Sequence, residues 1–254
     1  MIRTRARVEG AVGRITLARP ERYNALDETT ANELYAAIKR FDSATDVRVI
    51  VLDADGDDFC AGTDLESLER LVGAGRDAHK ADAHALGRVF VALRRAMKPS
   101  VAVVQGRALA GGAGLATACD LVLAHEGATF GYPDVRLGFV PAMVMAALRR
   151  AVGEKRAAEL VLTGRSLGAA EAERVGLVSR VLGAATFRDD VSEIVNGIAR
   201  TPEMALALTK RLLYHLDDLD FAAGIAAGVT TNVEARSTDE FRRGVQHVVR
   251  LRDQ

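Results

Sequence analysis

Short aliphatic segments, separated by glycine-containing turns and helices, constrain the fold of this chain most strongly. Residues 47–52 (VRVIVL), 100–105 (SVAVVQ) and 120–124 (DLVLA) are dense aliphatic runs, typical of strands that are buried on both faces. Residues 106–114 form a glycine-rich loop that enters a short helix before the third run. This succession of strand, glycine turn, helix and strand predicts an α/β fold.

The two ends of the chain differ in their patterning. Residues 5–8 and 12–17 alternate around a turn and predict a hairpin, and Asp27 is the expected N-cap of the helix that follows. Strand signals stop after residue 181, and helices are expected over residues 187–200, 202–215, 219–233 and 239–252. We therefore divide the chain into a core of residues 1–185 and a C-terminal helical region of residues 186–254.

Charge and cysteine content exclude several classes of partner. The 254 residues carry 34 basic and 34 acidic side chains, and this zero net charge argues against nucleic acid as the main partner. The longest uncharged stretches, residues 108–119 and 221–233, are shorter than the roughly 18 residues that suggest a membrane span. Charges among the first seven residues argue against a secretory signal. Two cysteines, Cys60 and Cys119, are too few for a disulfide framework, so we expect a cytoplasmic protein.

Common catalytic and cofactor motifs do not explain this sequence. The five histidines show no zinc-binding spacing, neither cysteine lies near a second ligand in the sequence, and no GxSxG motif is present, so no metal site is predicted. The segment from Gly106 to Gly111 has the spacing GxxxxG, but Gly112 and Ala113 stand where a phosphate-binding loop needs Lys and Ser or Thr.

Two glycine-rich turns remain, at residues 60–64 and 106–114, and each follows a buried strand and opens a helix. Backbone N–H groups at a helix start lack intrahelical partners, and the helix dipole there favours negative charge. Two such turns that face each other would bind one oxyanion, because glycine lets the backbone approach closely. The alternative is that both are only tight strand-to-helix turns.

Six co-linear blocks resemble the crotonase (enoyl-CoA hydratase/isomerase) superfamily. The first three are residues 19–26 (RPERYNAL), 59–65 (FCAGTDL) and 106–115 (GRALAGGAGL), the last continued by residues 118–121 (ACDL). The others are residues 130–138 (FGYPDVRLG), 160–164 (LVLTG) and 172–178 (AERVGLV). The likeness covers nearly the whole chain, in order and at the family's spacings.

The resemblance implies a crotonase-like (ClpP/crotonase) spiral of ββα units with a C-terminal all-helical trimerisation region, usually in a dimer of trimers. It implies an acyl-CoA thioester substrate, with no cofactor beyond the CoA of the substrate itself. The oxyanion hole carries over to the backbone N–H groups of Thr63 and Gly111. The CoA moiety would lie along Arg22, Tyr23, Ala25, Ala61, Asp64 and Leu65. For Asp64 we favour a helix N-cap over direct ligand contact.

The sequence departs from the family pattern at both catalytic acid positions, and at one of them it loses the acid. Family hydratases use two glutamates, which align here with Gly114 and Asp134. Gly114 has no side chain, so the first acid is lost, and we expect the missing side chain to leave volume beside the reacting carbons. Glu66, Glu69, His79 and His84 lie on helices that usually cover the acyl pocket, where each is either a second polar group or solvated surface.

Two function classes follow. The first is an enzyme that stabilises a thioester enolate and uses Asp134 as acid and base, for hydration or double-bond isomerisation of an enoyl-CoA. A single carboxylate favours isomerisation, because one group removes a proton and returns it elsewhere. The second is a non-catalytic acyl-CoA-binding homologue that has lost the acid pair. RNA binding, a third class, is disfavoured by the neutral charge.

Overall fold

A mostly parallel sheet of six strands forms the centre of the computed structural model, which describes residues 2–252. In sheet order the strands are β1 (Thr4–Glu9), β2 (Val12–Leu17), β3 (Val49–Ala54), β4 (Ser100–Val104), β6 (Leu121–His125) and β9 (Arg180–Leu182). β1 and β2 pair antiparallel, as expected for the predicted hairpin, and the later pairs are parallel. The three aliphatic runs therefore form β3, β4 and β6 at the middle of the sheet.

A second, three-stranded sheet consists of β5 (Arg107–Leu109), β7 (Thr129–Gly131) and β8 (Ser166–Gly168). β5 begins within the segment that we expected to be entirely loop, so that expectation is wrong for residues 107–109. These residues pair in parallel with β7, and a three-residue strand formed by such a distant partner has almost no local pattern. β4 and β5 thus belong to different sheets, and together with helix α4 they form one ββα unit.

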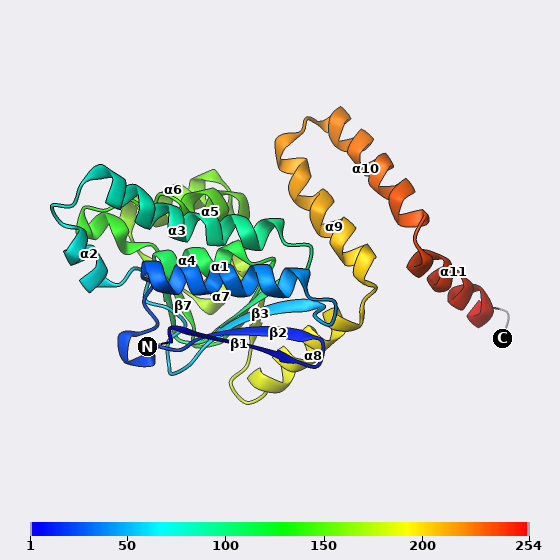
Figure 1. The fold of residues 1–254 in the computed structure, drawn as a ribbon, viewed down its shortest axis with the longest axis horizontal. Helices are drawn as coiled ribbons and strands as arrows, with labels where there is room; N and C mark the ends of the chain where they lie inside the picture. The colour runs from blue at the N-terminus through cyan, green and yellow to red at the C-terminus, as the bar shows by residue number, and fades with distance from the viewer. Residues whose placement is uncertain (1, 253–254) are drawn as a thin grey trace.

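Helices cover both faces of the six-stranded sheet (Figure 1). The α-helices are α1 (Glu28–Ser43), α2 (Leu65–Leu71), α3 (Arg76–Arg95), α4 (Gly111–Ala118), α5 (Val144–Val152), α6 (Glu154–Thr163), α7 (Ala169–Arg174), α8 (Phe187–Arg200), α9 (Glu203–His215), α10 (Phe221–Arg236) and α11 (Asp239–Arg252). Three short 3-10 helices are η1 (Pro20–Arg22), η2 (Pro133–Leu137) and η3 (Leu216–Asp218). None of the helices within residues 2–252 has both the length and the apolar character needed to cross a bilayer.

The strand period of two divides the core into two clusters. On β3, Ile50 and Leu52 belong to a large cluster with residues of α1, α3 and α4, whereas Val49 and Val51 pack with α8. These four side chains are each 2% exposed or less, so β3 is buried on both faces, as its aliphatic sequence predicts.

The chain is helical from residue 187 onward in the described range, apart from short connections, as the patterning predicts. α8 packs against the sheet, whereas α9, α10 and α11 extend to one side of the body, with α10 and α11 farthest from it (Figure 1). The division into a site-bearing core of residues 1–185 and an oligomerisation region of residues 186–254 stays a prediction.

Candidate active site

A cavity of about 1160 Å³ lies among the start of α1, helices α2 and α3, and the segment that follows η2. Eight of the residues predicted from the sequence line it: Arg22, Tyr23, Ala25, Ala61, Thr63, Asp64, Leu65 and Asp134. Gly111 directly follows Ala110, which also lines the cavity. Segments that are more than 100 residues apart in the chain therefore meet around one hollow, which is large enough for a small-molecule substrate.

The N–H group of Thr63 is turned away from the neighbouring backbone. The Leu26 N–H donates to the Gly62 carbonyl at 2.7 Å, and the Asp64 N–H donates to the Leu26 carbonyl at 2.8 Å. These bonds form an isolated parallel bridge between Leu26 and Thr63, so the Thr63 N–H points to the other side. Within residues 2–252 this N–H has no backbone partner.

The second unpaired donor lies at the start of α4, where the Gly111 N–H likewise has no backbone partner among the described residues. The two turns approach each other at Gly62, which has a φ of +100°. A Cβ on Gly62 would lie 3.5 Å from the Gly111 nitrogen and 2.8 Å from the Ala110 Cβ. Ala110 has a φ of 48° and a ψ of −120°, a conformation that is costly for a residue with a side chain. The backbone is therefore strained directly beside the Gly111 N–H.

Asp134 supplies a buried carboxylate to the same cavity. The residue is 7% exposed, and its Oδ2 atom is buried without a hydrogen-bond partner in the described part of the chain. Desolvation raises the pKa of the Asp134 carboxyl above its ordinary value, against a smaller lowering by a bond from its own backbone. A carboxylate in a cavity that has one unpartnered oxygen and a raised pKa is suited to proton transfer.

The space beside Gly114 is filled, so our expectation of free volume there is wrong. A Cβ added to Gly114 would lie 2.2 Å from Val144 Cγ1, 2.8 Å from Val144 Cβ and 3.2 Å from Phe90 Cζ. Gly114 is itself buried and does not line the cavity. The position that aligns with the first family acid is therefore closed by a valine from α5.

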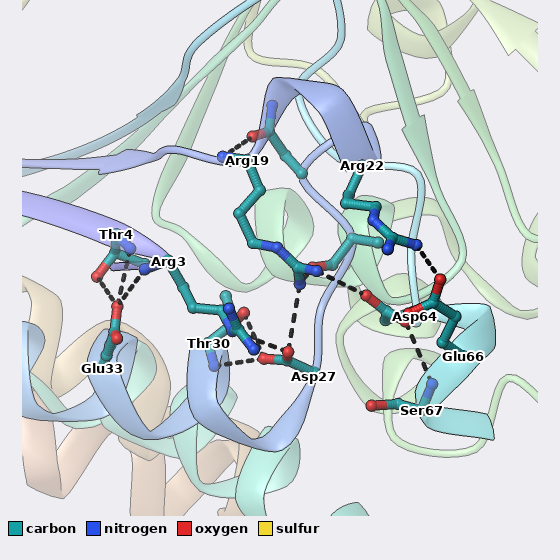
Figure 2. Close-up of polar contacts among 12 residues, drawn as sticks. Arg3, Thr4, Arg19, Arg22, Asp27, Thr30, Glu33, Asp64, Glu66 and Ser67 are labelled. Carbon is teal, nitrogen blue, oxygen red and sulfur yellow. Dashed lines mark hydrogen bonds and ion pairs between the residues drawn. The ribbon is translucent and has the colours of Figure 1, made fainter. Parts of the chain in front are cut away.

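A buried ion network supports the turn that carries Thr63 (Figure 2). Arg19 donates to Asp27 at 3.2 Å and to Asp64 at 3.0 Å, while Arg3 approaches the same Asp27 oxygen at 2.9 Å. The other oxygen of Asp27 accepts from the Thr30 N–H at 2.7 Å and caps α1, as predicted. Asp64 caps α2 in the same way, through the Ser67 N–H at 3.2 Å, which is the role that we favoured for it.

Of the four polar residues considered as a second catalytic group, two line the cavity and two do not. Glu66 lines the cavity but forms an ion pair with Arg22, and exposed His79 also lines it, whereas Glu69 and His84 do not. Asp82 on α3 was missed by the sequence analysis and lines the cavity as well. Desolvation raises its pKa, and the charges of Glu28 and Asp27 raise it further. The helical periodicity of α3 alone could have placed Asp82 one turn before Leu86, but not beside the cavity.

The family model described as Enoyl-CoA hydratase/isomerase matches residues 7–253. The chain belongs to the enoyl-CoA hydratase/isomerase family. A probable enoyl-CoA hydratase of Rhizobium meliloti (strain 1021) is 40% identical over 218 residues, which cover 85% of this chain and 83% of the relative. The family resemblance inferred from the six sequence blocks is thereby confirmed.

Solved structures agree with this family membership. The crystal structure of an enoyl-CoA hydratase from Mycobacterium smegmatis matches with a TM-score of 0.93 at 31% identity, over 98% of this chain and 97% of that chain. Human enoyl coenzyme A hydratase domain-containing protein 3 matches with a TM-score of 0.93 at 27% identity, over 98% of both chains. This enoyl-CoA hydratase/isomerase family member therefore has the crotonase-like α/β fold that was expected.

Proposed function

We propose that this chain is an acyl-CoA enzyme that stabilises a thioester enolate and transfers protons with one carboxylate, Asp134. The observation that carries the proposal is that the buried Asp134 carboxylate, whose Oδ2 has no partner in the described residues, lines the same cavity as Thr63. The Thr63 N–H has no backbone partner in those residues, and the Gly111 N–H beside the cavity has none either. The Asp134 carboxylate would serve as base and acid, and the N–H groups of Thr63 and Gly111 would form the oxyanion hole. One oxyanion-hole donor is worth roughly 2.7–4 kcal/mol of barrier in other enzymes.

The reaction that fits these groups best is isomerisation of a 3-enoyl-CoA to a 2-enoyl-CoA. The Asp134 carboxylate removes a proton from carbon 2, the electron pair of that C–H bond forms a double bond between carbons 1 and 2, and the π pair of the carbonyl group moves onto the thioester oxygen to give a dienolate. The N–H groups of Thr63 and Gly111 stabilise this oxygen. The protonated Asp134 then returns the proton to carbon 4, while the double bond forms between carbons 2 and 3, so no other reactant is needed.

Hydration of a 2-enoyl-CoA is the second candidate, because relatives such as the Rhizobium meliloti protein are named as probable hydratases. Hydration requires an activated water as well as protonation of carbon 2. Besides Asp134, the acidic and histidine side chains within residues 2–252 that line the cavity without a hydrogen-bonded partner are Glu21, Glu28, His79 and Asp82, and one of these would have to assist.

Six residues of the cavity, Arg22, Tyr23, Ala25, Ala61, Asp64 and Leu65, form the proposed surface for the CoA moiety, with no separate cofactor. Arg22, Tyr23 and Leu65 are exposed and therefore available to a ligand, whereas Asp64 is held by its cap and by Arg19. We include a cytoplasmic location in the proposal, which the two buried free thiols of Cys60 and Cys119 support.

Self-association is part of the same proposal. α10 has no buried residue, yet Phe221, Ile225, Val229 and Val233 form an exposed apolar stripe at a spacing of four residues. Such a stripe on a monomer indicates a protein interface. We propose that it packs in a homotrimer, or in a dimer of trimers.

Turnover of 2-enoyl and 3-enoyl-CoA substrates by the native chain and by Asp134→Asn tests the function. We expect the native chain to interconvert the two and the variant to lose about 10²–10⁴-fold in kcat while it still binds substrate. If Asp134→Asn retains turnover, another residue must be the base, and Asp82 is the first alternative. Binding without turnover at any pH would identify a non-catalytic acyl-CoA binder.

A further inference from the structure

The space beside Gly114 in α4 is filled by apolar side chains where the family pattern has an acid. Gly114 lies inside α4, and the nearest atoms along its missing side chain belong to Val144 and Phe90. Val144 is 4% exposed and Phe90 is 9% exposed. Neither side chain offers a hydrogen bond, so a water molecule could not be held there in place of the missing acid.

Residues close to these two in the chain line the cavity. Met143, the neighbour of Val144 in the chain, lines the cavity, and so does Leu86, one helical turn before Phe90 on α3. A Cβ on Gly111 would lie 3.4 Å from the Leu86 side chain, so this wall adjoins the proposed oxyanion hole. A side chain at residue 114 would have to displace Val144 before it could extend toward this wall.

We propose that Val144 is a specificity-determining residue of this site, because its side chain occupies the space that a side chain at residue 114 needs and so prevents a second acid there. The inference rests on the proposed function and adds the reason why proton transfer by Asp134 alone would be preferred. An acid at residue 114 would therefore also require the replacement of Val144.

The steric part is tested without substrate, by the sign of a stability change. In an unobstructed helix, Gly→Ala raises stability, because glycine is the poorer helix former. Gly114→Ala should instead lower the melting temperature of the native chain by about 5 °C or more, since its Cβ would overlap Val144 Cγ1. In a Val144→Gly background the same change should lower the melting temperature much less, because only the 3.2 Å contact with Phe90 Cζ remains.

Val144→Ala is the matched control, because it removes Cγ1 but keeps the Cβ that lies 2.8 Å from the added atom. Gly114→Ala should therefore remain destabilising in the Val144→Ala background. An increase in melting temperature in the native chain would show that Val144 does not close this position, and would overturn the inference.

The catalytic part compares Gly114→Glu with Gly114→Gln, each combined with Val144→Gly. The two side chains have nearly the same size, and only the first brings a carboxylate. We expect the ratio of hydration to isomerisation to rise at least 10-fold in the Glu variant over the Gln variant. Equal ratios in two folded variants would overturn the inference, while loss of isomerisation in Asp134→Asn would still support the proposed function. If Asp134→Asn in the native background retains full turnover, it is the proposed function that fails.

Discussion

Arg19 donates from Nη2 to Oδ2 of Asp64 across 3.0 Å, and the two side chains are only 10% and 6% exposed. The two residues are 45 positions apart, so this ion pair connects the segment after β2 to the start of α2 (Figure 2). Asp64 immediately follows Thr63, whose N–H is one of the two unpaired donors beside the cavity. The position of that donor therefore depends on a buried charge pair that does not itself need to touch substrate.

Asp64→Asn should lower kcat more than it changes KM. Asparagine is as good an N-cap as aspartate, so α2 keeps its cap, but the neutral side chain no longer holds Arg19 by charge. We expect a loss of about 10-fold in kcat, since a small displacement of a donor costs part of its contribution. Steady-state kinetics on the preferred enoyl-CoA measure it.

Asp220→Asn is the matched control for that variant. Asp220 caps α10 through the Ala223 N–H at 2.8 Å and lies in the C-terminal extension, away from the cavity residues. The same substitution there should leave kcat unchanged. An equal loss in both variants would mean that Asp64 acts on helix stability alone.

Local chemistry explains which features could be predicted from the sequence. The aliphatic runs give β3, β4 and β6 because strands buried on both faces need no alternation, and Asp27 and Asp64 cap helices through N–H groups only three residues away. The space at Gly114 could not be predicted, because Val144 fills it from 30 positions away. Asp82 was missed for a similar reason, since only the packing of α3 brings it to the cavity.

Gly111→Pro should lower kcat by about 10²–10³-fold, because proline has no N–H to offer the enolate oxygen. Gly111 is the first residue of α4, so the lost N–H makes no intrahelical hydrogen bond. Gly111→Ala is the control: its Cβ would have contacts of 3.4 Å or longer and its N–H is kept. Similar kinetics in the two folded variants would exclude Gly111 from the oxyanion hole.

Ala110→Gly should stabilise the protein, although alanine is ordinarily the more stable of the two. At a φ of 48° and a ψ of −120°, glycine avoids a backbone strain of about 1–3 kcal/mol that alanine bears. We expect the free energy of unfolding in urea to rise by about 1 kcal/mol. A decrease would mean that the surroundings favour alanine by more than the strain.

Val229→Asp should dissociate the proposed trimer. Val229 lies in the middle of the apolar stripe on α10 and is 60% exposed in the single chain, so a charge there would be buried without a partner in an assembly. Light scattering after size exclusion should give the mass of one chain for this variant and of three or six for the native protein. Thr230→Asp, on a different face of the same helix, should leave the native mass unchanged.

Asp134→Asn should also change how stability depends on pH. The Asp134 carboxyl has a raised pKa in the folded state, so the folded chain binds the proton more tightly than the unfolded chain. Its favourable contribution is fully present below the unfolded value of about 3.9 and is lost as the pH rises through the folded value. Asparagine carries no charge, so the variant should gain stability relative to the native chain as the pH rises through this window. Urea unfolding at pH 4 and pH 7 measures the free energy of unfolding of the variant minus that of the native chain. This difference should be larger at pH 7. A difference that is the same at both pH values would mean that burial does not shift this carboxyl, and would remove the physical reason for assigning it the proton transfer.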